Sequence, residues 1–357
     1  MPHGFHAVLA AASAALLALA GAGAAASENY RISGPVVHEN LAIYFVHGAS
    51  APGPVPLTLQ EGLANGSAQV HETGNVNQLD VENTGTTELF IQSGDIVKGG
   101  QQDRVLTVSL LIPPRSGRVP IASFCVEQGR WTARGKEDVR RFSSAASAVP
   151  SREAKIAIKA HPTASIGGPG QAAAFLSGDT GQRQRQVWEH VSKMQDKLSR
   201  AVAAPVAAPQ SRSSLQLSLE NEKLKDAQTG YVKALQPAGE SETDVVGYVF
   251  AVNGKLNSAD IYPSNGLFRK MWPKLLAANA TEAISDANAP GAELPSTADV
   301  LAFLDAAERG KAIEKPLPQN LKLEAREGEQ ALFFETRRAP VAPGTEGGWV
   351  HRNYLAK

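Results

Sequence analysis

The order of strand-like and helix-like segments is the feature of this sequence that most limits its fold. Between about residues 41 and 131, short apolar runs alternate with turn residues, which is typical of the strands of a β-sandwich or barrel. From about residue 182, apolar residues recur at helical spacing, and hairpin-like runs follow. Strands and helices are thus segregated and do not alternate as β-α-β units. This segregation predicts an α+β protein, with an N-terminal β-rich, sandwich- or barrel-like half followed by a half of helices and β-hairpins.

The boundaries of the predicted regions follow composition and turn residues. We expect a β-rich region over 27–135, an Ala/Ser/Gly-rich loop over 136–181 with a short element near Ile156, and an α+β region over 182–357. Ser264 is expected to cap one helix of that region, and Ser296 another. The expected elements of the α+β region are helices near 182–204, 215–236, 264–280 and 296–309, and a hairpin over 245–262 that turns at Asn253-Gly254.

Residues 1–26 have the features of a signal peptide. An apolar run over 7–20 is followed by Ala24-Ala25-Ala26, which fits the small-residue rule for cleavage before Ser27. A retained anchor helix is the alternative, because no Lys or Arg precedes the apolar run. No run of 18 apolar residues follows, so we expect no stable membrane span after cleavage. The sequence therefore predicts an exported protein, periplasmic or secreted.

Charge and cysteine content exclude several classes of function. The chain has 35 Lys and Arg against 35 Asp and Glu, so it lacks the overall positive field that holds nucleic acid. Its single cysteine, Cys125, permits neither an intramolecular disulfide nor a Cys-x-x-Cys site. No His-Glu-x-x-His motif or Cys/His cluster is present, so the sequence predicts no metal site and no cofactor.

A Gly-rich segment between two predicted strands is the sharpest polar motif of the chain. Gly99 and Gly100 permit positive φ and close backbone approach, while Lys98 and Arg104 flank them. Gln102 adds an amide donor. Backbone N–H groups together with two cations predict a binding patch for a small anion. The alternative is a tight turn or β-bulge whose Lys and Arg are simply solvated.

A second motif ends the predicted strand near residue 127. If that strand alternates regularly, Cys125 and Glu127 face the same side, and Arg130 and Trp131 follow at its end. One hypothesis is a polar ligand site with Trp131 as a platform. The alternative is a buried ion pair that fixes strand register, with Trp131 in the core.

Catalytic candidates are few. Glu127 or Asp95 could serve as an acid/base, with a flanking cation holding an anionic group. Cys125 could be a nucleophile only where a base or a cation lowers its pKa. His351 is a second-ranked candidate, for which a strand-surface position or an ion pair is the alternative.

The chain resembles the bacterial ARG and Rhodanese-Phosphatase-superfamily-associated Protein domain through two long motifs. These are Ser-Gly-Asp-Ile-Val-Lys-Gly-Gly-Gln-Gln-Asp-Arg at 93–104 and Ser-Phe-Cys-Val-Glu-Gln-Gly-Arg-Trp at 123–131. Weaker matches continue to His351, so the resemblance implies one family domain over 41–357. The family brings no assigned activity and no catalytic residue to carry over.

The sequence therefore favours an exported binding or interaction module whose polar patch lies around the Gly-Gly segment and the Cys125–Trp131 motif. Its partner would be a small anionic ligand or a protein. Two alternatives stay open: a hydrolase-type enzyme that uses Glu127 or Asp95, and a structural scaffold without a small-molecule ligand.

Overall fold

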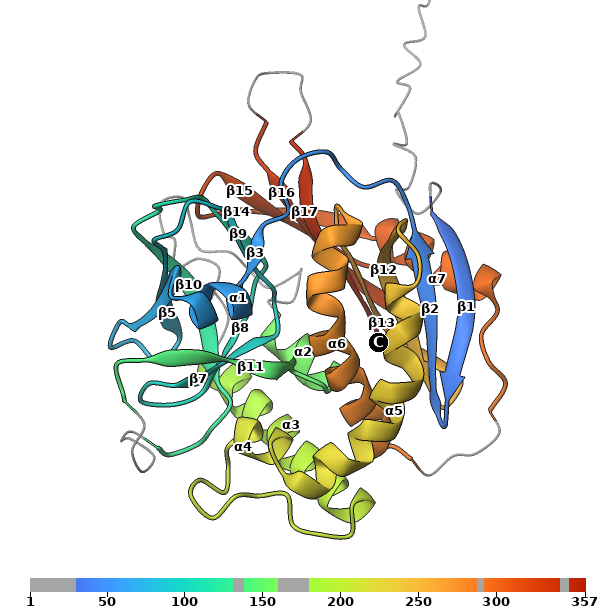
Figure 1. Ribbon diagram of the computed structural model, residues 1–357, viewed down its shortest axis with the longest axis horizontal. Helices are drawn as coiled ribbons and strands as arrows, with labels where there is room; N and C mark the ends of the chain where they lie inside the picture. Colours follow the sequence, from blue (N-terminus) through green and yellow to red (C-terminus); the bar gives the residue numbers. More distant parts are fainter. Residues whose placement is uncertain (1–29, 131–137, 160–179, 288–291, 341–346) are drawn as a thin grey trace, which may run out of the picture.

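Two β-rich layers and a set of helices make up the part of the chain that the structure describes. The computed structural model describes residues 30–130, 138–159, 180–287, 292–340 and 347–357. In these residues an N-terminal half-barrel of strands adjoins a large sheet that carries helices (Figure 1). The predicted α+β class is confirmed. The predicted signal peptide lies outside the described residues.

The large sheet has eight antiparallel strands in the order β1-β2-β12-β13-β17-β16-β15-β14. Strand β2 pairs with β12, so the beginning of the chain joins its C-terminal half in one sheet. The first strands therefore lie outside the barrel, although the sequence placed them with it. The strands are β1 (Arg31–His38), β2 (Leu41–His47), β12 (Val245–Val252), β13 (Lys255–Ile261), β14 (Lys311–Leu317), β15 (Leu321–Glu327), β16 (Ala331–Arg338) and β17 (Trp349–Ala356).

Strand β2 shows why these segments belong to a sheet that is covered on both faces. Every residue of β2 is buried. Leu41, Ile43 and Phe45 join the core beneath helices α5 (Glu222–Glu240) and α6 (Asn265–Ser285). The alternate residues, such as Tyr44, join a second core beneath α7 (Thr297–Glu308). A strand that is apolar at every position needs cover on both sides, and helices on opposite faces of the large sheet supply it (Figure 1).

The half-barrel consists of a six-stranded sheet in the order β11-β7-β8-β10-β5-β4 and a three-stranded sheet in the order β3-β6-β9. Helix α1 (Leu59–Asn65) packs against β4 and β11, the two edges of the larger of these sheets. The strands are β3 (Leu57–Thr58), β4 (Ala68–Glu72), β5 (Gln78–Asn83), β6 (Leu89–Ile91), β7 (Asp95–Gly99), β8 (Arg104–Leu106), β9 (Leu110–Ile112), β10 (Arg118–Cys125) and β11 (Phe142–Ala148).

The segments between residues 136 and 240 differ from the sequence-based expectation at two places. The helix expected over 215–236 is two helices, α4 (Leu215–Leu219) and α5, because Asn221 caps a new helix by accepting a hydrogen bond from Leu224 N–H. The expected loop over 136–181 contains the strand β11, which the sequence did not predict; α2 (Arg152–Ile158) is the short element expected near Ile156, and α3 (Thr180–Ala201) begins at the end of the loop. Residues 160–179 of that loop lie outside the described residues.

Local signals predicted one hairpin turn and the starts of two helices. Asn253 and Gly254 both have positive φ, at 51° and 73°, and they turn the hairpin of β12 and β13. Ser264 caps α6, and Ser296 forms a capping box with Asp299 at the start of α7.

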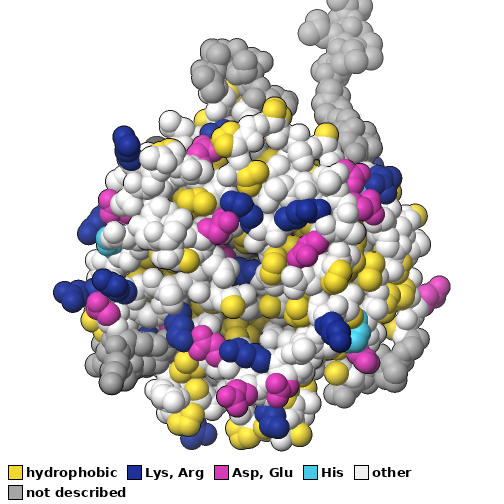
Figure 2. Space-filling view, viewed as in Figure 1, with side chains coloured by type: hydrophobic (Ala, Val, Ile, Leu, Met, Phe, Trp, Pro, Cys, Tyr) yellow, Lys and Arg dark blue, Asp and Glu magenta, His cyan; other side chains and the backbone are white. Residues whose placement is uncertain are grey.

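The surface shows no strong separation of charge on the face in Figure 2. Lys and Arg side chains are interspersed with Asp and Glu there, in keeping with the zero net charge. No helix among the described residues is long and apolar enough to cross a membrane.

Candidate functional site

The Gly-Gly segment is a tight connection between β7 and β8, which are antiparallel neighbours. Gly99 and Gly100 have positive φ, at 118° and 55°. A Cβ atom on Gly99 would collide with the backbone of Arg141, and one on Gly100 would collide with the Phe142 ring. Both glycines are thus required by close packing against the start of β11.

The backbone N–H groups of this turn have acceptors within the protein. Gly99 N–H donates to Asp103 Oδ1 at 3.0 Å, and Gln101 N–H donates to Glu72 Oε1 at 2.8 Å. Gly100 N–H donates to a backbone carbonyl 3.1 Å away. A bound anion would have to displace these acceptors. Anion binding at the turn stays a prediction, and the hydrogen bonds favour the tight-turn alternative.

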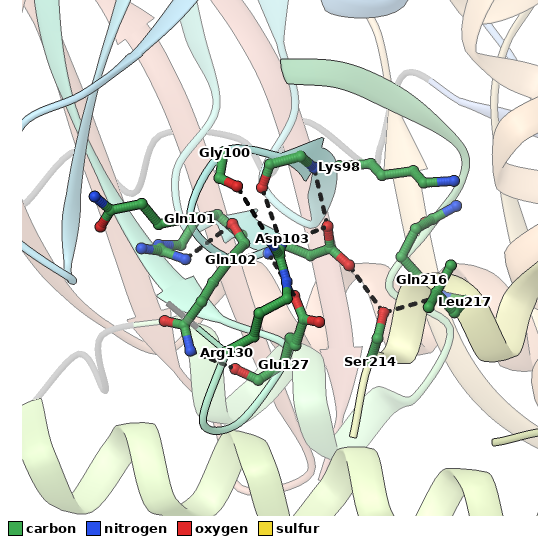
Figure 3. Close-up of polar contacts among 12 residues, drawn as sticks. Lys98, Gly100, Gln101, Gln102, Asp103, Glu127, Arg130, Ser214, Gln216 and Leu217 are labelled. Carbon is green, nitrogen blue, oxygen red and sulfur yellow. Dashed lines mark hydrogen bonds and ion pairs between the residues drawn. The ribbon is translucent and has the colours of Figure 1, made fainter. Parts of the chain in front are cut away.

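Glu127 and Arg130 form a buried ion pair against the turn (Figure 3). Glu127 Oε2 accepts from Arg130 Nε at 2.8 Å and from Asp103 N–H at 3.1 Å. Arg130 also donates to the carbonyl oxygens of Gly99 and Gly100, at 3.3 and 3.2 Å. The pair therefore holds the turn against the end of β10, which favours the register-fixing alternative for this motif.

Gln102, Arg104 and Lys98 have three different partners. Gln102 Nε2 donates to the carbonyl of Glu127 at 3.1 Å. The nearly fully buried Arg104 donates from Nη1 to the carbonyl of Gln102 at 2.9 Å. Lys98 Nζ pairs instead with Glu220, just after α4, at 2.7 Å. The structure therefore brings Gln102 and Glu127 to the turn, and directs Lys98 away from it.

The remaining predicted candidates lie in other environments. Asp95 Oδ1 is 2.5 Å from Lys274 Nζ, and this buried ion pair joins the half-barrel to α6. Cys125 Sγ donates to Gln102 Oε1 at 3.1 Å. Burial raises the pKa of the Cys125 thiol, which opposes a nucleophilic role. Trp131 lies outside the described residues. Acid/base roles for Asp95 and Glu127 stay predictions.

A second group of buried polar side chains lies on the face of the large sheet beneath α6. Strand register assembles it, because Asp260 on β13 is opposite both Tyr248 on β12 and Asn353 on β17. Tyr248 OH donates to Asp260 Oδ2 at 3.0 Å, and Asn353 Nδ2 donates to Oδ1 at 2.7 Å. We call this group the polar centre and define it as Ser109, Lys159, Tyr248, Asn257, Ser258, Asp260, Asn279, Glu282, His351 and Asn353.

Helix α6 contributes Asn279 and Glu282, which lie three residues apart on one side of the helix. Glu282 Oε1 accepts from Asn257 Nδ2 at 3.0 Å, and burial raises the pKa of Glu282. Buried side-chain atoms without a hydrogen-bond partner among the described residues are concentrated here. Because buried polar atoms are normally paired, this concentration makes the polar centre a candidate site. These atoms are Asn257 Oδ1, Ser258 Oγ, Asn279 Nδ2 and Oδ1, Glu282 Oε2, His351 Nε2 and Asn353 Oδ1.

Ser109 enters the polar centre from the half-barrel, in the connection between β8 and β9. Its Oγ lies 2.9 Å from His351 Nδ1. His351 Nε2 lies 3.1 Å from Asp260 Oδ1, although its N–H does not point straight at that oxygen. Burial lowers the pKa of His351 while the neighbouring carboxylate opposes the shift. The pKa of Asp260 is lowered, because His351 and nearby lysines outweigh burial. A neutral imidazole therefore lies between a serine hydroxyl and a carboxylate.

A small cavity lies against these groups. It offers about 10 Å³ to the centres of water-sized molecules, which is room for about one water. Lys159, which follows α2, is only 8% exposed, and its Nζ lies 4.4 Å from the centroid of the Phe334 ring. Burial lowers the pKa of Lys159 to about 7, although Asp260 opposes the shift. The polar lining of the cavity comes from Ser93, Thr107, Ser109, Lys159, Thr336, His351 and Asn353.

Sequence reasoning ranked His351 as a secondary candidate and missed the rest of the polar centre. A signal was present in the predicted hairpin, where Asn257, Ser258 and Asp260 place three polar residues among the last five of the second strand. Asn279 and Glu282 similarly interrupt an apolar helix. Ser109 and Lys159 carry no such local signal.

Comparison with protein families identifies what the chain is similar to. A sequence model of the ARG and Rhodanese-Phosphatase-superfamily-associated Protein domain matches residues 29–355. The chain belongs to this family. The match covers the half-barrel and the large sheet together, so the polar centre between them lies within the family domain. Neither the curated proteins nor the solved structures gave a significant match.

Proposed function

We propose that this family member is an exported binding module that holds a small anionic ligand in the polar centre. The observation that carries the proposal is the position of the Lys159 ammonium group. It is buried beside the cavity, and within the described ranges no carboxylate lies at ion-pair distance from Nζ. A buried cation without a paired anion lowers the stability of the folded protein, because it has lost its hydration. A bound anion would offset this loss.

The lining of the cavity supports a small polar anion over an apolar ligand. Lys159 is the lining group that would donate to a carboxylate, phosphate or sulfate oxygen, because the Thr107 hydroxyl donates to the carbonyl of Ala122 at 3.2 Å and Ser109 Oγ lies 2.9 Å from His351 Nδ1. The room for about one water fits a halide-sized anion, or one oxygen atom of a larger oxyanion. The Gly-Gly turn is less favourable, because its N–H groups already have internal acceptors.

The experiment is a thermal-shift series on the mature chain, Ser27–Lys357, with formate, acetate, phosphate and sulfate as probes. An anion at about 100 times its Kd should stabilise the protein by about 2.7 kcal/mol. Because the anion binds the protonated amine, binding should take up a proton near neutral pH. Affinity should fall as the pH rises above about 7, the pKa of Lys159 in the free protein.

Three lysine variants locate the site. Lys159→Met should abolish the anion-induced shift, whereas Lys193→Met, on the exposed face of α3, should retain it. Lys98→Met removes the cation next to the Gly-Gly turn in the sequence, which pairs with Glu220 in the structure. A shift that survives in Lys159→Met and disappears in Lys98→Met would contradict the polar centre and place the anion near Lys98.

Export is the second part of the proposal, supported by the apolar run and the small residues before Ser27. Expression in a Gram-negative host, followed by osmotic-shock fractionation and N-terminal sequencing, tests it. The expected product begins at Ser27 in the periplasmic fraction. An uncleaved chain that stays with the cells would contradict export by this signal.

A further inference from the structure

Ser109 Oγ accepts from Ser93 N–H at 3.0 Å and lies 2.9 Å from His351 Nδ1. His351 Nε2 lies 3.1 Å from Asp260 Oδ1, and the nearby carboxylate favours the tautomer that carries its proton on Nε2. In that tautomer, Nδ1 has a free lone pair and accepts the hydroxyl proton of Ser109. This order of hydroxyl, imidazole and carboxylate is the arrangement that activates a serine for attack.

We propose that Ser109 is a nucleophile toward esters of short-chain acids, with His351 as its general base and Asp260 as a positioning residue. The inference rests on the proposed function, because Lys159 would hold the developing negative charge in the same cavity. In most serine hydrolases Nε2 faces the serine and Nδ1 faces the carboxylate, whereas here Nδ1 faces Ser109 and Nε2 faces Asp260. Either nitrogen can act as the base when the other carries the proton.

The reaction is balanced by groups in the site and by water. Ser109 Oγ forms a bond to the ester carbonyl carbon while its proton passes to His351 Nδ1. The C–O bond to the alcohol then breaks, and the alcohol leaves with that proton. Water attacks the acyl-serine ester, gives a proton to His351, and releases the carboxylic acid as the proton returns to Ser109 Oγ.

Packing fixes the imidazole in place and limits the size of the acyl group. The His351 ring lies 5.0 Å from the Tyr262 ring and 5.9 Å from the Phe90 ring, measured between centroids. The cavity at Ser109 has room for about one water, so the site should accept formyl or acetyl groups in preference to longer chains. Phe90 belongs to the half-barrel, whereas Tyr262 and His351 belong to the large sheet, so the site exists only when both parts are folded together.

The test uses p-nitrophenyl acetate and the mature wild-type protein. We expect a burst of one equivalent of p-nitrophenol, and peptide mapping should place an acetyl group on Ser109. Ser109→Ala should lose both, while Ser241→Ala, at an exposed serine after α5, should behave like wild type. His351→Gln should slow the burst by about 10²–10⁴-fold.

The pH profile tests the positioning role of Asp260. The burst rate should rise as His351 loses its proton, with a midpoint below 6.5 because burial lowers the pKa of His351, and should fall again above about pH 7 as Lys159 loses its proton. In Asp260→Asn the midpoint should move lower still, because the carboxylate that raises this pKa is gone. An unchanged midpoint would overturn the role of Asp260.

The outcomes separate this inference from the proposed function. Anion binding that depends on Lys159, with no acetyl group on Ser109, would overturn the inference and leave the proposed function standing. Acetylation of Ser109 without anion-induced stabilisation would support the inference and overturn the proposed ligand. Acetylation confined to lysines would also overturn the inference.

Discussion

Replacement of Lys159 by Met should make the protein more stable, because the buried ammonium group costs folding free energy. Burial lowers the pKa of Lys159 from 10.5 to about 7. At about 1.4 kcal/mol per pH unit, that difference corresponds to about 4–5 kcal/mol at neutral pH. Methionine keeps much of the volume and loses a contact with the Phe334 ring worth about 1 kcal/mol. We therefore expect a net gain of about 2–4 kcal/mol in the free energy of unfolding.

Calorimetry and urea unfolding at several pH values measure this effect. With an unfolding entropy of about 2.1 cal/mol/K per residue, the mature chain should show a rise in Tm of about 3–6 °C. Between pH 7 and 10.5 the unfolded wild type binds more protons at Lys159 than the folded protein, so wild-type stability should gain over this range. Lys159→Met should lack this gain, and the two proteins should converge toward high pH.

The matched control is Lys193→Met, whose side chain is exposed and pairs with Glu189 on the same helix. It should leave both the Tm and its pH dependence unchanged. A Lys159→Met protein that is less stable than wild type at pH 7, with the same pH dependence, would refute the reasoning. It would mean that the ammonium group is compensated in the folded protein.

Three further predictions concern the residues that the sequence first singled out. Glu127→Gln should lower the free energy of unfolding by about 3 kcal/mol in urea titrations, because it leaves Arg130 buried without its closest carboxylate. A loss below about 0.5 kcal/mol would contradict this prediction. Lys98→Ala should cost at most about 1 kcal/mol in the same assay, since its pair with Glu220 is partly exposed, and a larger loss would show that the pair is important for the fold. Cys125 should react with iodoacetamide far more slowly in the native protein than in urea, because burial raises its pKa and covers it, and equal rates would contradict this.

Local sequence signals predicted the elements that depend on short-range chemistry. The Asn253-Gly254 turn, the cap at Ser264 and the capping box at Ser296 each involve residues within a few positions of one another. An apolar run likewise predicted the strand β2, whose burial on both faces is seen only in the structure. The pairing of β2 with β12 could not be predicted, because about 200 residues separate them and no local feature specifies the partner.

The polar motifs were recognised in the sequence, but a motif does not specify whether its hydrogen-bond donors are free. Gly99, Gly100 and Arg130 have the composition of an anion cradle, yet the fold supplies internal acceptors for the turn and for the guanidinium group. The polar centre was missed because its residues are far apart in the sequence. Ser109 and His351 are 242 positions apart in the chain, and only the packing of the half-barrel on the large sheet brings them together.

The most direct test of the central claim is the position of a bound anion in a crystal of the mature chain. Soaking with bromide and measuring anomalous scattering locates the anion without any assumption about the ligand. The account predicts an anomalous peak in the cavity, in contact with Lys159 Nζ and facing Ser109 Oγ. Peaks confined to the Gly99–Gly100 turn or to surface cations, with none at Lys159, would contradict it.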